Sequence, residues 1–447
     1  MTRKRTRRKS APEAKELHAF METAIAESRR TKGMTATEFF EYIKGEDPSY
    51  LLPPMVDEAY LTLAEFAAVT SLGRLARDLD SEVRRTADEA NWDRAVKSAY
   101  VSVDGEIAKE GAPPIPEAVT NRVLDAAKER IRQASGPITH YLGCYLFDNP
   151  KPQAFTIGPV EFMPGTDLPS RIARECGSRP KWFDDYEKLQ QDPHLAELRE
   201  RTRLHPHADD VYYMSRLPWV AAVRVEGYEP SMSQRRATDA ARLAIGGLAL
   251  NLHPNSSRAM SLINEWGRPL VTRTMLQAPG RDVAVGVRNN RPQVHASGEV
   301  KELMQSQSEY LAWLGELVSE AIANAKHPRR LRDGWLNALY WYQIACSEAS
   351  DARATICFST SIESLSLSIG AQAIIEWLEN ILDLDRGKIV APNLRWTLEE
   401  AVGEIYEAAR SEAVHGGRFI IFQEYQRQRG LAAELCRYVL LLYSTIA

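Results

Sequence analysis

Cysteine is scarce in this sequence. Five cysteines are scattered over 447 residues, and no two of them form a C-x-x-C pair. Such an odd, dispersed set provides neither a disulfide framework nor the ligand spacing of a small zinc site. The sequence therefore favours a reducing compartment and argues against a zinc knuckle. The five positions are Cys144, Cys176, Cys346, Cys357 and Cys436.

Long apolar runs are missing as well. The run YVLLLY, from Tyr438 to Tyr443, is far shorter than the roughly 20 residues of a membrane-spanning helix. The N-terminus has no apolar segment like that of a secretory signal. We expect a soluble, cytoplasmic protein without membrane contact.

Several enzyme motifs are also missing. The chain has no Walker A lysine motif, no G-x-G-x-x-G and no G-x-S-x-G. ATP hydrolysis, dinucleotide binding and α/β-hydrolase chemistry therefore lack support in the sequence. We expect no cofactor and no metal site.

Neither sign of charge dominates the chain. It has 56 Lys and Arg against 60 Asp and Glu, a formal net charge of −4, so any contact with a nucleic acid must come from a local patch. One basic run, RKRTRRK at residues 3–9, could hold a polyanion through counterion release. We favour a disordered, solvated tail over residues 1–12, because basic runs at chain ends often make no specific contact.

The length suggests two or three domains, each able to bury a core. We predict a mainly helical α+β multidomain fold. Its parts are a helical N-terminal region at 13–135, a mixed α/β domain and possible sensor at 136–300, and a helical domain at 301–447.

The middle segment carries the strand signals. ITHYLGCYLF, and then FTIGPVEFM after the turn-like DNPKP, look like two strands of a hairpin or meander. WVAAVRVEG predicts another strand before a helix at about 233–252. PLVTRTMLQ and DVAVGVR predict two more strands on either side of the turn APGR.

Helical patterns dominate on both sides of this segment. In the N-terminal region the PPIP run at residues 113–116 separates two of the expected helices. Thr397 and Glu400 form a capping box, and Gly416 and Gly417 provide the matching stop signal. The expected C-terminal helices cover 301–326, 333–349, 351–368, 371–383, 397–415 and 419–445, interrupted by HPRR, Gly370 and the loop DLDRGKIVAPN.

The segment RSEAVHGG, Arg410 to Gly417, could carry chemistry. A guanidinium can hold a phosphate bidentately while a histidine moves a proton near neutral pH, which suits metal-free cleavage of RNA. Arg410 and His415 lie off the apolar stripe of the predicted helix and point about 140° apart in ideal geometry. They would therefore have to converge through unwinding at Gly416 or across a dimer interface.

The C-terminal region resembles the HEPN superfamily, particularly its Apea-like branch. The resemblance covers about residues 330–447 and depends on FSTSIESLSLSI, LEEAVGEIYEAARSEAVHGG and the long final helix. It implies a helical bundle that usually dimerises and brings two Arg-x4-6-His motifs into one cleft. It also implies Arg410 and His415 as catalytic residues, Ser411 as the polar position after the arginine, and Glu363 as a nearby acidic residue.

The same resemblance implies a function. Catalytic members are metal-independent ribonucleases of toxin, antiphage and CRISPR-associated systems, so we expect an RNA substrate, a homodimer and a phage-derived trigger. Other members are not catalytic and only dimerise or bind a nucleotide or protein, and this alternative stays open.

Three further groups of residues are candidates for function. HPHADD contains ligand types suited to a transition metal, although Pro206 and the lack of further ligands favour a polar loop. The cluster Trp335, Tyr340, Trp341 and Tyr342 could stack bases, but helical spacing favours core or dimer packing. Ser411, Arg395 and Arg418 are expected to bind RNA, within a wider basic set that also contains Arg386, Lys388, Arg427 and Arg429.

Overall fold

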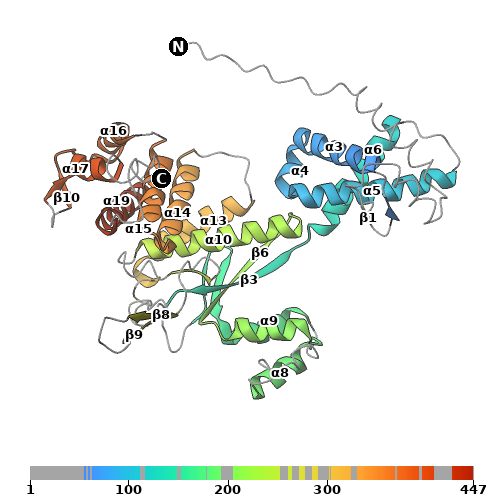
Figure 1. The fold of residues 1–447 in the computed structure, drawn as a ribbon, viewed down its shortest axis with the longest axis horizontal. Helices are drawn as coiled ribbons and strands as arrows, with labels where there is room; N and C mark the ends of the chain where they lie inside the picture. Colours follow the sequence, from blue (N-terminus) through green and yellow to red (C-terminus); the bar gives the residue numbers. More distant parts are fainter. Residues whose placement is uncertain are drawn as a thin grey trace, which may run out of the picture. The chain divides into compact units, whose positions relative to one another are not determined.

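Figure 1 shows the computed structural model of the protein. It describes residues 55–56, 59–60, 63–110, 116–147, 153–177, 179–192, 205–251, 260–263, 271–276, 284–289, 302, 304–323, 330–367, 370–391, 395–406 and 425–445. The expected basic tail and the expected helical region up to residue 54 lie outside these residues.

The chain separates into two compact units. Unit 1 consists of Met1–Ile138 and Val225–Arg235, and unit 2 of Thr139–Arg224 and Arg236–Ala447. The described residues are mainly helical with a small antiparallel sheet, which confirms the coarse fold class expected from the sequence. The boundary expected at residue 300 lies inside unit 2, and the division into three parts stays a prediction.

Unit 1 packs its helices around an apolar core that contains Trp92 and Val96. The indole N–H of Trp92 donates to the carbonyl oxygen of Gly73 at 2.7 Å, so this large side chain is buried with its polar atom satisfied. The predicted helices are confirmed here, while the short antiparallel pair β1 (Met55–Val56) and β2 (Ala59–Tyr60) was not predicted. The described helices are α3 (Leu63–Leu79), α4 (Ser81–Thr86), α5 (Glu89–Glu110) and α6 (Pro116–Ala134).

A buried carboxylate closes two helix starts in unit 1. Glu229 directly precedes α10 (Pro230–Leu250) and is almost fully buried. Its carboxylate accepts the backbone N–H groups of Ser231, Met232 and Asp88 and the side-chain amide of Asn91, at 2.7 to 3.3 Å. These donors belong to the starts of α10 and α5, where N–H groups lack partners within the helix and the helix dipole favours negative charge.

A five-stranded sheet forms part of unit 2, in the order β4-β5-β6-β3-β7. Antiparallel pairs join β4 to β5, β5 to β6 and β3 to β7, with Phe155 opposite Phe162 and Cys144 opposite Leu262. The strands are β3 (Ile138–Tyr145), β4 (Phe155–Ile157), β5 (Val160–Pro164), β6 (Trp219–Val225) and β7 (Ser261–Leu262).

The expected pairing of ITHYLGCYLF with FTIGPVEFM is wrong. FTIGPVEFM folds on itself into the hairpin β4-β5, which turns at Gly158 with a φ of 57°, a conformation that favours glycine. β6 then lies between β5 and β3. Its first five residues, Trp219 to Val223, are all buried, and such a strand needs cover on both faces, which a central position provides.

Other strand and helix predictions in this part of the chain are confirmed, with shifted ends. β8 (Val271–Leu276) pairs antiparallel with β9 (Ala284–Asn289), as the two segments around APGR predicted. The helix expected at 233–252 is α10, which begins three residues earlier at Pro230. The remaining helical elements here are η1 (Gly165–Asp167), α7 (Leu168–Glu175), α8 (Phe183–Gln191) and α9 (Pro206–Ser215).

Helices also make up most of the C-terminal part of unit 2, and Figure 1 shows α14, α15 and α19 side by side. The loop expected at DLDRGKIVAPN is partly wrong, because Ile389–Ala391 form β10 and pair with β11, Trp396–Thr397. The helix expected at 397–415 is α-helical from Leu398 to Gly403, and residues 404–406 are π-helical. The described helices are α13 (Ser308–Ala323), α14 (Arg330–Ser347), α15 (Asp351–Ser366), α16 (Ala371–Leu382), α17 (Leu398–Gly403) and α19 (Gln426–Ser444).

Two aromatic residues of α14 confirm the packing interpretation. Trp335 and Tyr342 are fully buried. The indole N–H of Trp335 donates to the carbonyl oxygen of Leu440 in α19 at 3.0 Å, and the ring of Tyr342 contacts that of Phe358 in α15. Tyr340 and Trp341 are half-buried and contact each other edge to face.

Candidate functional site

Glu363 lies in the fourth turn of α15. Its side chain is partly buried, and its Oε1 atom is shielded from solvent. The residues around it on α15 that face the interior include Ser359, Ile362 and Ser366. Glu363 therefore does not simply point into solvent, and its carboxylate lies at the edge of the helical core.

Tyr406 is fixed to α15 one helical turn before Glu363. The phenol O–H of Tyr406 donates to the backbone carbonyl oxygen of Ser359 at 2.7 Å, and Tyr406 is buried. Ser359 precedes Glu363 by four residues, which is about one helical turn. The described chain thus reaches Tyr406, four positions before Arg410, one turn away from Glu363.

The start of this segment is set by the predicted capping box. The Thr397 side chain accepts the backbone N–H of Glu400, and the Glu400 carboxylate accepts the backbone N–H of Thr397, so the two residues cap α17 reciprocally. The π-helical residues 404–406 follow. A π turn rotates the side chains beyond it relative to a regular α-helix, and such turns are frequent at functional sites.

The described chain resumes at Tyr425 and there contacts the residues just before Tyr406. Tyr425 is buried, and in the first turn of α19 the Gln428 side-chain amide donates to the Glu404 carboxylate at 2.9 Å. Residues 404 and 428 are thereby held in contact. The stretch between Tyr406 and Tyr425 therefore starts beside α15 and ends at the start of α19, where Gln428 contacts Glu404.

Four of the six predicted site residues belong to that stretch. Arg410, Ser411, His415 and Arg418 lie outside the described residues. The structure describes the other two, Glu363 on α15 and Arg395 directly before β11. Arg395 is exposed and forms no hydrogen bond or ion pair within the described part of the chain, so it does not contact Glu363 there.

A buried seam of small polar side chains brings the helices around Glu363 close together. Ser361 is fully buried; its hydroxyl donates to the carbonyl oxygen of Ala338 in α14 and lies 3.1 Å from the sulfur of Cys436 in α19. Burial raises the pKa of the Cys436 thiol. Cys436 is therefore a packing residue in the protonated form, and Ser361 of FSTSIESLSLSI links α15 to α14 and α19.

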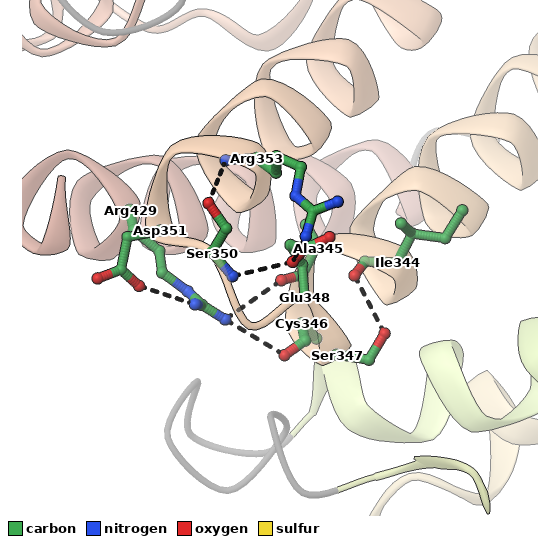
Figure 2. Close-up of polar contacts among 9 residues, drawn as sticks. All are labelled: Ile344, Ala345, Cys346, Ser347, Glu348, Ser350, Asp351, Arg353 and Arg429. Carbon is green, nitrogen blue, oxygen red and sulfur yellow. Dashed lines mark hydrogen bonds and ion pairs between the residues drawn. The ribbon is translucent and has the colours of Figure 1, made fainter. Parts of the chain in front are cut away.

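Arg429 closes the corner between α14 and α15 from the side of α19 (Figure 2). One guanidinium nitrogen lies 2.8 Å from Asp351 Oδ1, and the other is 3.4 Å from the carbonyl oxygens of Ala345 and Cys346. These carbonyls end α14, and Asp351 begins α15. The cation faces the negative end of one helix and the anion lies at the positive end of the next, which favours both charges.

The expectation that Arg429 might contact RNA is wrong. Its side chain is 1% exposed, whereas that of Asp351 is 38% exposed. An arginine that is enclosed by a carboxylate and two helix-end carbonyls cannot reach a phosphate in solution. Its position on α19 is the reason, because the buried residues Ala432, Ala433 and Cys436 follow it at helical spacing.

The same corner carries a second, more exposed set of contacts in Figure 2. The Ser350 hydroxyl caps α15 by accepting the backbone N–H of Arg353, and the Ser350 N–H donates to Glu348 at 2.9 Å. Arg353 also pairs with Glu348 at 3.2 Å. The short turn between α14 and α15 is therefore held by local capping on its outer side and by Arg429 on its inner side.

The other basic residues of the predicted RNA-binding set differ in availability. Arg386 pairs with Glu379 at 2.6 Å, and this hydrogen-bonded partner raises the pKa of the Arg386 guanidinium and lowers that of the Glu379 carboxyl. The guanidinium of Arg427 lies over the indole ring of Trp396, 4.3 Å from its centroid. Lys388 is exposed. Of these cations, Arg386 already has a carboxylate partner.

The HPHADD segment is a helix start and not a loop. α9 begins at Pro206, where the missing N–H of proline does no harm, so the expectation of a polar loop is wrong. The Nδ1 atom of His205 accepts the backbone N–H of His207 at 3.3 Å. His205 therefore acts as the N-cap of α9.

Sequence reasoning missed Tyr406, Gln428 and Asp351 as residues that shape this region. Each acts through a contact with an element distant in sequence, so no local pattern marked it. The burial of Arg429 did have a signal, because its spacing to Ala432, Ala433 and Cys436 puts it on the apolar stripe of α19.

Comparison of the chain with protein-family models, curated proteins and solved structures gave no match. None of the described helices has a stretch that is long and apolar enough to cross a membrane.

Proposed function

We propose that this protein is a metal-independent endoribonuclease of the HEPN type that acts as a homodimer. One observation supports it most. The described chain is anchored on both sides of the RSEAVHGG segment. Before it, Tyr406 donates to the carbonyl oxygen of Ser359, one helical turn before Glu363, and after it, Gln428 contacts Glu404. This arrangement suits a segment that must be held beside an acidic residue.

In the proposed reaction the ribose 2′-oxygen attacks the adjacent phosphorus and the 5′-oxygen leaves. His415 exchanges the protons, as base toward the 2′-hydroxyl or as acid toward the leaving oxygen, and Arg410 binds the phosphate as negative charge develops. The products are a 2′,3′-cyclic phosphate and a 5′-hydroxyl. Glu363 would hold a donor group of the site through its carboxylate, and Ser411, Arg395 and Arg418 would contact the RNA.

The proposed setting is defence against phage, as the resemblance implies. In this setting residues 1–300 sense a phage-derived trigger and restrain the nuclease, because an unrestrained ribonuclease would harm its own host. The alternative is a HEPN scaffold that only dimerises or binds a nucleotide or protein.

Substitution of the motif separates the two functions. We expect RNA from a bacterial host that expresses the wild-type chain under phage challenge to be cut, with 2′,3′-cyclic phosphate ends. Arg410→Ala and His415→Ala should each lower cleavage by at least 100-fold, an order of magnitude that fits loss of general acid–base catalysis. The circular dichroism spectrum should stay unchanged.

A matched control is Arg353→Ala, which removes an exposed arginine of the same unit and should leave cleavage intact. Intact RNA in every condition, with protection from phage retained in the His415→Ala variant, would favour the scaffold.

A further inference from the structure

An indole and a guanidinium are stacked on the surface of unit 2. Trp396 is the first residue of β11, and Arg427 belongs to the first turn of α19. The Arg427 guanidinium lies 4.3 Å from the centroid of the Trp396 ring, which is half-buried, while Arg427 itself is exposed. The ring holds a flat cation whose residue stays exposed to solvent.

Two further cations, Lys388 and Arg395, lie at the two ends of the β10-β11 hairpin. Arg395 directly precedes Trp396 and is exposed, with a φ of 54°. Lys388 directly precedes Ile389, which pairs with Thr397, and its carbonyl oxygen accepts the backbone N–H of Leu398 at 2.9 Å. Backbone pairing thus places Lys388 opposite Leu398 at one end of the hairpin and Arg395 at the other end.

Three carboxylates near the hairpin are already engaged, whereas Glu399 on α17 is exposed. Glu379 binds Arg386, Asp385 accepts the backbone N–H of Gly387, and Glu400 caps α17. Within the described residues, neither Lys388, Arg395 nor Arg427 pairs with a carboxylate. We name the surface formed by Lys388, Arg395, Trp396 and Arg427 the hairpin surface; its three cations are not neutralised within the described structure.

We propose that the hairpin surface binds single-stranded RNA. The exposed face of the Arg427 guanidinium, supported by Trp396, stacks against an unpaired base, and Lys388 and Arg395 contact the phosphates on either side. A duplex cannot present a base face to this platform, so the geometry favours a single strand. The choice of RNA over other polyanions rests on the proposed function.

The test measures binding apart from cleavage. The full chain carrying His415→Ala is titrated against a labelled single-stranded oligoribonucleotide, and the dissociation constant is read from fluorescence anisotropy at several salt concentrations. In this background Arg427→Lys keeps the charge and removes the planar group, and it should weaken binding roughly tenfold through lost stacking. Lys388→Ala with Arg395→Ala should reduce the salt slope by about 1.4, because each phosphate contact on a single strand contributes about 0.7.

Arg386→Ala is the matched control, because Glu379 already neutralises this arginine. The affinity of this variant for the oligoribonucleotide should stay within about twofold of that of the parent chain. Unchanged affinity in Arg427→Lys together with an unchanged salt slope in the double variant would overturn the proposal. Equal affinity for a duplex would also overturn it.

The two proposals can fail separately. Hairpin variants that weaken RNA binding, in a chain whose wild type never cuts RNA, would retain the binding surface and reject the nuclease. A wild type that cuts RNA, with hairpin variants that bind RNA normally, would support the nuclease and reject the hairpin surface as the binding site.

Discussion

The two units close their helix ends with buried side chains of opposite charge. In unit 1 the carboxylate of Glu229 accepts four N–H groups at the starts of α5 and α10. In unit 2 the guanidinium of Arg429 meets the carbonyls that end α14. Both signs match the helix dipole. The difference is that Glu229 is stabilised by neutral donors, whereas Arg429 also needs an ion-pair partner, Asp351.

This difference has an energetic consequence. A carboxylate surrounded by short N–H contacts keeps full hydrogen bonding without a counter-charge. A buried guanidinium that loses its carboxylate is left as an uncompensated charge, which is the more costly defect. We therefore expect the Arg429 corner to be more sensitive to loss of its partner than the Glu229 cap is to loss of its charge.

The largest stability effect should come from Asp351→Ala. It leaves Arg429 buried and without a carboxylate within the described structure, and it should lower the free energy of unfolding by about 3 kcal/mol. Hydrogen exchange measured by mass spectrometry should show lost protection in α14, α15 and the first turns of α19.

The double variant Asp351→Ala with Arg429→Met serves as the control, because it removes both charges. It should recover part of the loss, and a double variant at least as damaging as the two single changes combined would contradict the ion-pair explanation.

A smaller effect is expected from Glu229→Gln. The amide keeps one acceptor oxygen but places an N–H₂ group where the carboxylate accepted backbone N–H groups, so about 2 kcal/mol of stability should be lost. The loss should appear as faster hydrogen exchange at the starts of α5 and α10. Glu226→Gln, an exposed glutamate nearby in sequence, is the matched control and should change little.

The smallest effect concerns a partly exposed cap and depends on pH. Asp80 accepts the backbone N–H groups of Glu82 and Val83 at the start of α4. Its side-chain contact with Lys128, together with these N–H groups, lowers the pKa of its carboxyl. A carboxyl with a lowered folded pKa stabilises the fold above its unfolded pKa of about 4, and the contribution is lost as the pH falls through the folded pKa.

Asp80→Ala should therefore cost about 1 kcal/mol at pH 7, and the difference from wild type should shrink in acid. Urea unfolding at pH 7 and pH 3, followed through α4 peptides by hydrogen exchange, measures this. Asp80→Asn keeps the capping oxygen and should retain most of the cap, so an equal loss in both variants would show that the charge and not the cap dominates.

Local patterns predicted most of the described elements. Apolar spacing marked the helices of unit 1 and the C-terminal helices, and the capping box of Thr397 and Glu400 is present with both of its hydrogen bonds. These features depend on contacts within a few residues, which the sequence displays directly.

Pairings between distant segments could not be predicted in the same way. β6 lies between β5 and β3 although it follows both in sequence, and β10 pairs with β11 inside a segment that resembled a loop. A strand pattern shows which residues can be extended, but the partner is chosen by burial on both faces and by the connections available.

In the candidate site, too, some features come from the local sequence and others from contacts between distant segments. The residue types and spacing of Arg410 and His415, and the HEPN resemblance, come from the sequence alone, and they stay predictions about residues outside the described structure. Contacts across space decided the rest: Glu363 is shielded, Arg429 is buried and unavailable to RNA, and Arg427 stacks on Trp396.

By itself the sequence determined the mainly helical α+β character, the helix caps and the motif, because each depends on neighbours along the chain. Only the tertiary structure decided which partners the arginines have, although the place of Arg429 on the apolar stripe of α19 already indicated its burial. The physical reason is that the environment of a charge depends on groups brought from distant parts of the chain, such as Asp351 and the end of α14 around Arg429.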